Sequence, residues 1–396
     1  MKANPGGQID PKGVIGRDEI IEQIWDTIEH QSICMNAERR IGKTTIIKKL
    51  LAEPRSGWIP IYQDLEKIET ALGFAEAVYI DVDQYLSTRK RTVRRAREFL
   101  ESIGGTEIGG KLKLPKFERN APWREILSKS IEDLVEAREK HGERPLFLWD
   151  EVPYMLDKIG KREGKNVAMD VLDVLRSLRQ EEDTQGLRMI LTGSIGIHHV
   201  IHSLKSQGHA SSPLNDTYPL EVFPLTTEFA EELVGQLLTG EKINTQNPAG
   251  VAYAIADISD CFPFYIQHIV KALKMKLAMQ QVTPDMVESI VNEQLLNDHD
   301  PWDMRHFRTR ILEYYGKVDE ITVLSILDSV AVRENPVSVS DLLSELKNLG
   351  KPVELEHLRD ILKLLSQDHY LTRNDQGNYH FKFPLIKRWW KLDREL

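Results

Sequence analysis

One stretch constrains this sequence more than any other, and it reads Ala37-Glu38-Arg39-Arg40-Ile41-Gly42-Lys43-Thr44-Thr45. It follows the phosphate-binding pattern G-x-x-x-x-G-K-[ST], except that Ala37 stands where the first glycine is expected. The apolar run Ser32-Ile33-Cys34-Met35 before it predicts a short buried strand, and residues 45–51 after it have helical spacing. The sequence therefore predicts a P-loop between a strand and a helix. The alternative is a Gly-Lys-Thr at an ordinary helix start.

The predicted loop offers several kinds of contact to a nucleotide. Backbone N–H groups of the loop and of the first helical turn point into one concavity that suits phosphate. Lys43 would meet the β- and γ-phosphates, and Thr44 would offer its hydroxyl to Mg²⁺. Gly42 lets the backbone approach closely, whereas Ala37 is strained if the turn needs a φ above zero. The candidate ligands of ATP or ADP here are Ala37, Glu38, Arg39, Arg40, Ile41, Gly42, Lys43, Thr44 and Thr45.

A second informative stretch runs from Pro145 to Glu151 and is apolar until its last two residues, which are carboxylates. This pattern predicts a buried parallel strand that carries charge at its C-terminal edge. Asp150 would hold Mg²⁺ through its hydration shell, and Glu151 would act as general base or orient water for attack on the γ-phosphate. The alternative is an acidic pair at the start of a helix, because the residues from Val152 onward also suit a helix.

A third strand with a polar end is predicted from Arg188 to Ser194. Thr192 and Ser194 are placed to touch the γ-phosphate or the attacking water, although turn chemistry after a strand also explains them. Upstream of the loop, Val14-Ile15 would lie against an adenine ring or pack as a hydrophobic staple on the helix that follows.

The overall composition restricts the class of protein. A chain of 396 residues is expected to hold two or three domains of roughly 100–200 residues each. The formal net charge of −9 excludes a protein that coats nucleic acid with its whole surface, but leaves room for a local basic patch. Cys34 and Cys261 are the only cysteines, which favours a reducing compartment. No segment resembles a signal peptide or a membrane span, so we expect a cytoplasmic protein without a membrane partner.

One basic patch lies in the largely helical stretch from Phe74 to Leu100. Its cations are Arg89, Lys90, Arg91, Arg94, Arg95 and Arg97. They form either a solvated helix face or a surface for DNA, RNA or an acidic partner.

The C-terminal part of the sequence changes character at Thr226, after which helical segments follow one another. Beyond a boundary at residues 297–301, three short helices and a hairpin around Asn374-Asp375-Gln376-Gly377 predict a winged-helix layout. The expected fold class is α/β, a P-loop NTPase with a parallel sheet, followed by an all-α lid subdomain and a C-terminal winged-helix domain. The expected domains span residues 1–225, 226–300 and 301–396.

The predicted winged helix gives a divided signal for DNA binding. Its would-be recognition helix carries more acidic than basic side chains, which would repel phosphate: Glu354, Glu356, Asp360 and Asp368 against Arg359 and Lys363. The tail Lys387-Arg388-Trp389-Trp390-Lys391 is basic and aromatic, but its tryptophans have the spacing of core residues. Contact with protein or closure over the nucleotide is therefore favoured over DNA binding.

Taken together, these motifs resemble those of the archaeal-type ATPases of the STAND class, which are relatives of AAA+ initiator ATPases. The resemblance rests on Gly16-Arg17-Asp18-Glu19, Arg39-Arg40, Leu148-Trp149-Asp150-Glu151, Thr192-Gly193-Ser194, Phe223-Pro224-Leu225, Phe262-Pro263-Phe264 and the run from Tyr379 to Trp390. It implies a switch driven by ATP and ADP, in which Ile15, Gly16, Arg17 and Pro263 also lie at the nucleotide. Two positions depart from the family pattern, Ala37 in the loop and Asp260-Cys261-Phe262-Pro263 in place of Gly-x-Pro.

The sequence therefore predicts an ATPase that binds Mg²⁺ and ATP, hydrolyses ATP slowly and acts as a switch in a regulatory or defence-type complex. A protein partner or self-assembly is expected. One alternative is an initiator-like or transposition-regulator-like ATPase that is loaded on duplex DNA through Arg89–Arg97 and the winged helix. Another is a scaffold that holds nucleotide without enzymatic activity.

Overall fold

The computed structural model describes the chain except residues 8, 88–93, 105, 109–110, 114–121, 140–141, 182–183, 185, 194–196, 199, 202–211 and 277–279, and only the backbone of 87, 94, 106–108, 111–113, 139 and 318. The described chain divides into two compact units. The core unit consists of Asp18–Ala37 and Lys43–Val222, and the C-terminal unit consists of Met1–Arg17, Glu38–Gly42 and Phe223–Leu396. The expected domain boundaries at residues 225 and 300 stay a prediction.

The core unit is built on a five-stranded sheet with the order β2-β5-β6-β1-β7. The strands are β1 (Ile33–Ala37), β2 (Trp58–Asp64), β5 (Arg144–Asp150), β6 (Arg188–Thr192) and β7 (Tyr218–Val222). All neighbouring strands are parallel, which confirms the predicted fold class. Because parallel strands end at the same edge, Ala37, Asp64, Asp150 and Thr192 all terminate at one side of the sheet.

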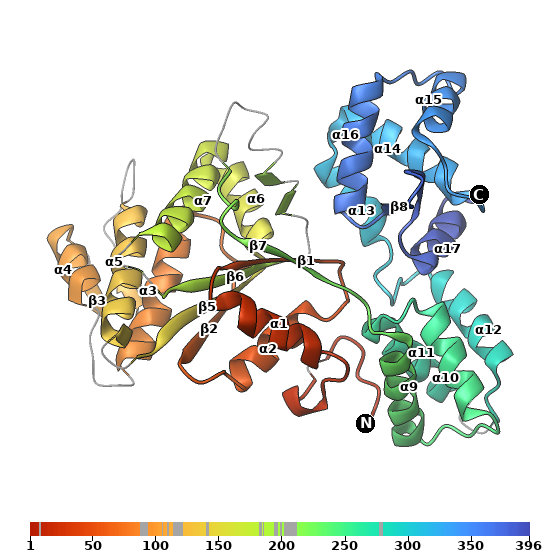
Figure 1. Cartoon of the computed structure of the whole chain (residues 1–396), viewed down its shortest axis with the longest axis horizontal. Coiled ribbons are helices and arrows are strands. Elements are labelled where there is room, and N and C mark those ends of the chain that lie inside the picture. The colour runs from red at the N-terminus through yellow and green to blue at the C-terminus, as the bar shows by residue number, and fades with distance from the viewer. Residues whose placement is uncertain are drawn as a thin grey trace. The chain divides into compact units, whose positions relative to one another are not determined.

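Helices cover both faces of this sheet, with α1 and α2 on one side and α6 and α7 on the other (Figure 1). The helices of the unit are α1 (Asp18–Ile28), α2 (Lys43–Ala52), α3 (Ala71–Ser87), α4 (Arg94–Ser102), α5 (Trp123–Glu139), α6 (Val152–Glu163) and α7 (Lys165–Gln180). Alternate strand residues such as Phe147 and Trp149 are buried in one apolar core with α3, α5, α6 and α7. The glycine-bracketed segment after α4 forms a small hairpin, β3 (Thr106–Ile108) with β4 (Lys111–Lys113).

The largest segment of the C-terminal unit, Phe223–Leu396, begins with the predicted run of helices. These are α9 (Thr227–Glu241), α10 (Pro248–Ile258), α11 (Pro263–Lys276) and α12 (Pro284–Leu295). A winged-helix arrangement follows, with α13 (His306–Tyr314), α14 (Gly316–Ala331), α15 (Val339–Asn348), α16 (Leu355–Gln367), β8 (Leu371–Arg373), β9 (Tyr379–Phe381) and α17 (Pro384–Asp393). The strands β8 and β9 pair antiparallel, as the hairpin signal predicts. Trp389 and Trp390 are buried, which agrees with the interpretation that they belong to the core.

The N-terminal arm is held by hydrogen bonds to two helices of the C-terminal unit. Its glycine and proline content suggests a loose segment, yet Ala3 is buried and its N–H donates to Glu241 Oε1 at 2.9 Å. The N–H of Asn4 donates to Gln267 Oε1 at 2.8 Å, and Pro11–Gly13 form a 3₁₀ turn. Side-chain acceptors on α9 and α11 thus satisfy the backbone of the arm, a pairing that local sequence does not reveal.

None of the helices in the described part of the chain combines the length and the apolarity that crossing a bilayer demands.

Candidate functional site

The loop that follows β1 keeps its P-loop course without a glycine at its first position. Ala37 is the last residue of β1 and is not among the residues with positive φ. The left-handed conformations fall instead at Arg40, with a φ of 69°, and at Gly42, with a φ of 105°. The backbone of Ala37 is therefore unstrained, and the non-glycine residue of the loop with a strained, left-handed backbone is Arg40.

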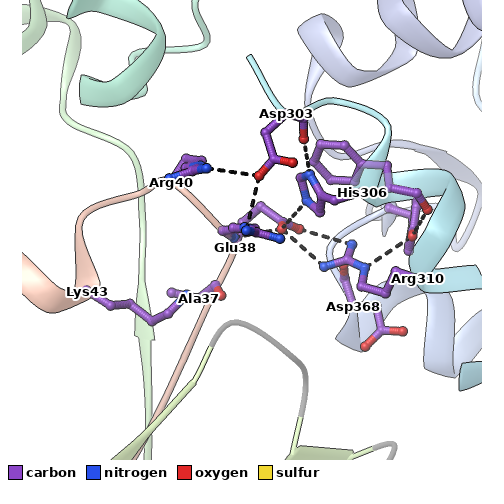
Figure 2. Close-up of polar contacts among 11 residues, drawn as sticks. Ala37, Glu38, Arg40, Lys43, Asp303, His306, Arg310 and Asp368 are labelled. Atoms are coloured by element: carbon purple, nitrogen blue, oxygen red, sulfur yellow. Dashed lines mark hydrogen bonds and ion pairs between the residues drawn. The ribbon is translucent and has the colours of Figure 1, made fainter. Parts of the chain in front are cut away.

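Lys43 and Thr44 occupy the first turn of α2 at the carboxyl edge of the sheet. The ammonium of Lys43 is buried and donates to the carbonyl of Ala37 at 2.8 Å, as Figure 2 shows. The hydroxyl of Thr44 donates to Asp150 Oδ2 at 2.9 Å. The P-loop helix and the end of β5 are thereby joined through the two side chains expected at a magnesium-phosphate site.

Asp150 lies in a strongly charged part of the core unit. Its side chain is buried, and this burial raises its pKa, while the hydrogen bond from Thr44 and the charge of Lys43 act in the opposite direction. Nearby Tyr62 has its pKa raised to about 12 by burial and by the negative charges of Asp150, Asp64 and Glu151. A site with excess negative charge favours a cation.

Glu151 follows Asp150 directly and precedes α6. It has a left-handed backbone with a φ of 58°, and its N–H donates to Asp150 Oδ1 at 3.1 Å. Its side chain is half-buried. A non-glycine residue in this conformation between a strand and a helix is uncommon and is often found at functional sites.

Thr192 ends β6, the strand that lies between β5 and β1. Its hydroxyl is buried and has no hydrogen-bond partner in the part of the chain that the structure describes. It lines a small pocket together with Asn36, Pro153 and Gly193. Ser194, the second predicted sensor, lies outside the described residues. Thr192 is thus a polar group whose environment leaves its hydrogen-bonding capacity unused.

The donor set suits magnesium better than a transition metal. Thr44 and Asp150 offer hard oxygen atoms, and Mg²⁺ is usually bound by one or two protein oxygens together with water and phosphate. Within the described ranges, no group of three or more His, Cys, Asp or Glu side chains has metal-binding geometry. The residues present therefore fit a nucleotide-bound Mg²⁺.

The predicted adenine-side residues belong to the C-terminal unit. Gly16 has a φ of +66°, and a Cβ there would lie 2.7 Å from Phe229 Cβ, so only glycine fits. Arg17 is buried and donates to the carbonyls of Phe223 at 2.7 Å and of Ile41 at 2.8 Å. Burial lowers its pKa to about 10. Arg17 thus binds the loop segment itself through Ile41, and Ile15 beside it is half-buried.

Pro263 is the first residue of α11. Just before it, Cys261 has a φ of 58°, a left-handed conformation that glycine adopts without strain. In Cys261-Phe262-Pro263, the cysteine therefore replaces the glycine of Gly-x-Pro but keeps the left-handed backbone that glycine favours.

The remaining loop residues bind side chains that the sequence did not single out. Figure 2 shows Glu38 beside Arg310 and His306 of α13, and Arg40 beside Asp303. These partners are within the C-terminal unit, to which Glu38–Gly42 also belongs. The sequence offers one indirect signal for them, a run of charged residues after the boundary at residues 297–301.

The basic patch is only partly described. Arg89, Lys90 and Arg91 lie outside the described residues, and only the backbone of Arg94 is described. Arg95 forms ion pairs with Glu132 at 3.5 Å and Glu136 at 2.9 Å, and Arg97 lies 3.8 Å from Asp83. These two arginines therefore have acidic partners on neighbouring helices.

Comparison with solved structures identifies the fold of the chain. No protein-family model matches the sequence, and neither does any curated protein. Among solved structures, the chain is similar to the Walker-type ATPase PABY2304 of Pyrococcus abyssi, with a TM-score of 0.63 and 15% identity over 96% of this chain and 97% of that one. The fold is that of a P-loop ATPase. It is also similar to the ORC2 protein of Aeropyrum pernix in its ADPNP–ADP complexes, with a TM-score of 0.54 and 12% identity over 98% of this chain and 97% of that one.

Proposed function

We propose that this chain is a Mg²⁺-dependent ATPase that binds ATP and ADP firmly, hydrolyses ATP slowly and acts as a nucleotide-dependent switch. The observation that carries the proposal is the hydrogen bond between Thr44 and Asp150, at the carboxyl edge of a parallel sheet and beside the buried Lys43. This arrangement supplies a cation, a hydroxyl and a carboxylate where a P-loop fold takes nucleotide phosphates. The STAND class and a regulatory or defence-type complex are the finer part of the proposal, and they rest on the motif resemblance.

Each residue of the core site has a distinct role in this proposal. Lys43 binds the β- and γ-phosphates in place of the Ala37 carbonyl. Thr44 and Asp150 would hold Mg²⁺, which when bound neutralises charge on the phosphates. Glu151 accepts a proton from water or orients it, and Thr192 or Ser194 senses the γ-phosphate. The Thr192 hydroxyl has no hydrogen-bond partner among the described residues, which supports the last role.

The residues of the C-terminal unit act on the nucleotide less directly. Arg17 positions the loop segment through Ile41, and Gly16 lets the chain pass close to Phe229 of α9, while Ile15 and Pro263 are proposed to approach the base and sugar. The division into a P-loop core, a helical lid and a winged helix, and a cytoplasmic location, belong to the same proposal.

Nucleotide binding is tested with fluorescent mant-ADP and mant-ATP, with and without Mg²⁺. Lys43→Ala should weaken binding at least tenfold, since a hydrogen bond to a charged group contributes about 1.5–3 kcal/mol. Lys48→Ala on the same helix is the matched control and should bind as the wild type does. Equal affinity in Lys43→Ala and Lys48→Ala would reject the site.

Hydrolysis is tested separately by release of γ-phosphate. Glu151→Gln should keep ATP bound while turnover falls about 10²–10⁴-fold, the usual contribution of a general base. Equal turnover by the wild type and Glu151→Gln would remove Glu151 from the mechanism. Bound nucleotide without turnover in the wild type would favour the scaffold alternative.

A protein partner or self-assembly is proposed in preference to DNA. The exposed residues of α16 include Glu356 and Asp360, and Arg359 is paired with Glu356, so this helix offers phosphate little net attraction. Titration of the full chain with duplex DNA at low salt tests this choice. Salt-dependent binding that is lost when Arg95 and Arg97 are neutralised would favour the DNA alternative.

A further inference from the structure

The loop segment Glu38–Gly42 belongs to the compact C-terminal unit, although in the chain it joins β1 to α2 of the core unit. Its first residue is held most tightly. The side chain of Glu38 is 1% exposed, and both of its oxygens accept from Arg310, from Nη1 at 3.1 Å and from Nη2 at 3.4 Å. Oε1 also accepts the N–H of Arg39 at 2.7 Å. The loop carboxylate is therefore buried against a two-pronged guanidinium.

Arg310 is itself fixed by the winged helix (Figure 2). Its Nε donates to the Tyr370 hydroxyl at 3.1 Å, and its Nη2 donates to the Asp368 carbonyl at 3.0 Å. The guanidinium carbon lies 4.6 Å from the centre of the Tyr370 ring and 5.3 Å from that of Phe307. A guanidinium held on so many sides is preorganised for one carboxylate position.

A second pair of contacts anchors the next two loop residues. Arg39 and Arg40 both reach Asp303 Oδ2, at 3.1 Å and 2.9 Å. The guanidinium of Arg40 also lies 4.4 Å from the centre of the Phe264 ring. His306 connects the two anchors, because its Nδ1 contacts the Asp303 carbonyl and its Nε2 lies 3.9 Å from Glu38 Oε1.

The two anchors differ in strength. The Asp303 side chain is 35% exposed, so its ion pairs are screened by solvent and contribute little. The Glu38–Arg310 pair is buried, and removing one partner of a buried pair leaves the other charge uncompensated. Burial alone would raise the pKa of Glu38, but Arg310 together with His306 and His369 holds it well below its ordinary value. The carboxylate is therefore ionised at neutral pH.

We propose that the Glu38–Arg310 pair is a clasp through which the C-terminal unit controls the phosphate loop, so that nucleotide exchange requires the clasp to open. The inference rests on the proposed function and names the regulation of its site. A P-loop surrounds phosphate with backbone N–H groups, so phosphate enters or leaves readily only when this backbone moves. Glu38 is one residue from the end of β1, and fixing it fixes the start of the loop. Motion of α13 is thereby coupled to the rate at which nucleotide binds and dissociates.

The test uses the full chain, three single variants and one double variant that combines the first two. Glu38→Gln removes the charge and keeps a side-chain oxygen for the Arg39 N–H, and Arg310→Met keeps an unbranched chain against Phe307 and Tyr370. Arg308→Met is the matched control, since Arg308 is on the same helix and pairs at 3.3 Å with Asp393 instead of the loop. Circular dichroism spectra establish which variants retain the native fold.

Two measurements follow, the rate of mant-ADP release after adding excess ADP, and hydrogen–deuterium exchange of the peptide covering residues 38–42. Glu38→Gln and Arg310→Met should each speed release at least tenfold and raise exchange in that peptide, whereas Arg308→Met should do neither. In the double variant, release should be no faster than in the faster single variant, because both changes open one contact.

The outcomes separate the clasp from the proposed function. Unchanged loop exchange in the folded Glu38→Gln protein overturns the clasp, whether or not nucleotide binds. Raised loop exchange with unchanged mant-ADP release overturns the control of nucleotide exchange. A wild-type protein that binds no mant-ADP overturns the proposed function, and the deuterium measurement then still judges the structural contact.

Discussion

The contact between Gly193 and Pro153 yields a sharp quantitative prediction. Gly193 follows β6, and Pro153 lies in the first turn of α6, two residues after Glu151. A Cβ added at Gly193 would lie 2.5 Å from Pro153 Cδ and 2.9 Å from Pro153 Cγ. Carbon atoms pack best at about 3.5–4.0 Å, so Gly193→Ala must displace the proline or the strand end.

The size of this effect can be worked out from the same distances. Overpacking a rigid core typically costs about 1–3 kcal/mol, and we expect Gly193→Ala to lower the free energy of unfolding by that amount. Pro153→Ala removes both clashing atoms and costs about 0.4–1 kcal/mol through the lost rigidity of proline. The next atom near the new Cβ is Glu151 Cα at 3.5 Å, an ordinary contact. The double variant should therefore be nearly as stable as Pro153→Ala alone.

Urea unfolding of the four proteins measures this coupling. Because the chain has two compact units with tryptophans in both, intrinsic fluorescence and circular dichroism are followed together, and coincident transitions establish that the free energies can be compared. Additive losses in Gly193→Ala and Pro153→Ala would refute the steric argument. We further expect Gly193→Ala to reduce ATP turnover more than mant-ADP affinity, since the displaced turn carries Glu151.

The remaining predictions concern the C-terminal unit and the proposed magnesium site. Burial raises the pKa of Asp260 to about 7 from 3.8, so between these values only the folded state holds the proton and stability falls as pH rises, by up to about 1.4 kcal/mol per pH unit. Asp260→Asn keeps an acceptor for the Leu385 N–H and should reduce the difference between the unfolding free energies measured at pH 5 and at pH 8. An unchanged difference contradicts this. Cys261→Gly should match or exceed wild-type stability by up to about 1 kcal/mol, whereas Cys261→Val should lose more than that, as thermal unfolding would show. Thr44→Ser should retain Mg²⁺-dependent nucleotide binding and Thr44→Val should lose it; equal Mg²⁺ dependence of mant-ATP binding would reject the role of the hydroxyl.

The parallel sheet was predictable because its strands carry strong local signals. The segments that became β1, β5 and β6 are short apolar runs with polar ends, and a strand buried on both faces requires that pattern. Asp150 and Thr192 could be placed at one edge for the same reason. Their roles in catalysis stay predictions.

The three helices predicted before the hairpin correspond to α14, α15 and α16, and α13 was missed because its buried face is partly charged. Its apolar positions Phe307 and Ile311 are too few to form a clear stripe, and the third buried residue is Arg310. An arginine at that position looks solvent-exposed in a sequence. Only its partner Glu38, far away in the chain, explains its burial.

The course of the loop could not be predicted for a related reason. Ala37 attracted attention as the odd residue, yet the strained residue is Arg40, with a φ of 69°. A left-handed backbone costs a non-glycine residue about 1–2 kcal/mol. Local sequence contains nothing that offsets this cost, because the partners of Arg40 are Phe264 and Asp303.

Those partners offset the strain only narrowly. A half-exposed ion pair contributes about 0.2–1 kcal/mol, and a cation–π contact at an exposed site contributes about 0.5–1 kcal/mol. Their sum is close to the cost of the left-handed backbone at Arg40, so the loop conformation is nearly balanced without the buried Glu38–Arg310 pair. Breaking the Glu38–Arg310 pair would therefore leave the loop conformation held by little free energy, which makes the shape of the loop dependent on α13. Such a dependence would suit the switch role that we propose, and it rests on the loop's partners Phe264, Asp303 and Arg310, which lie outside the P-loop motif.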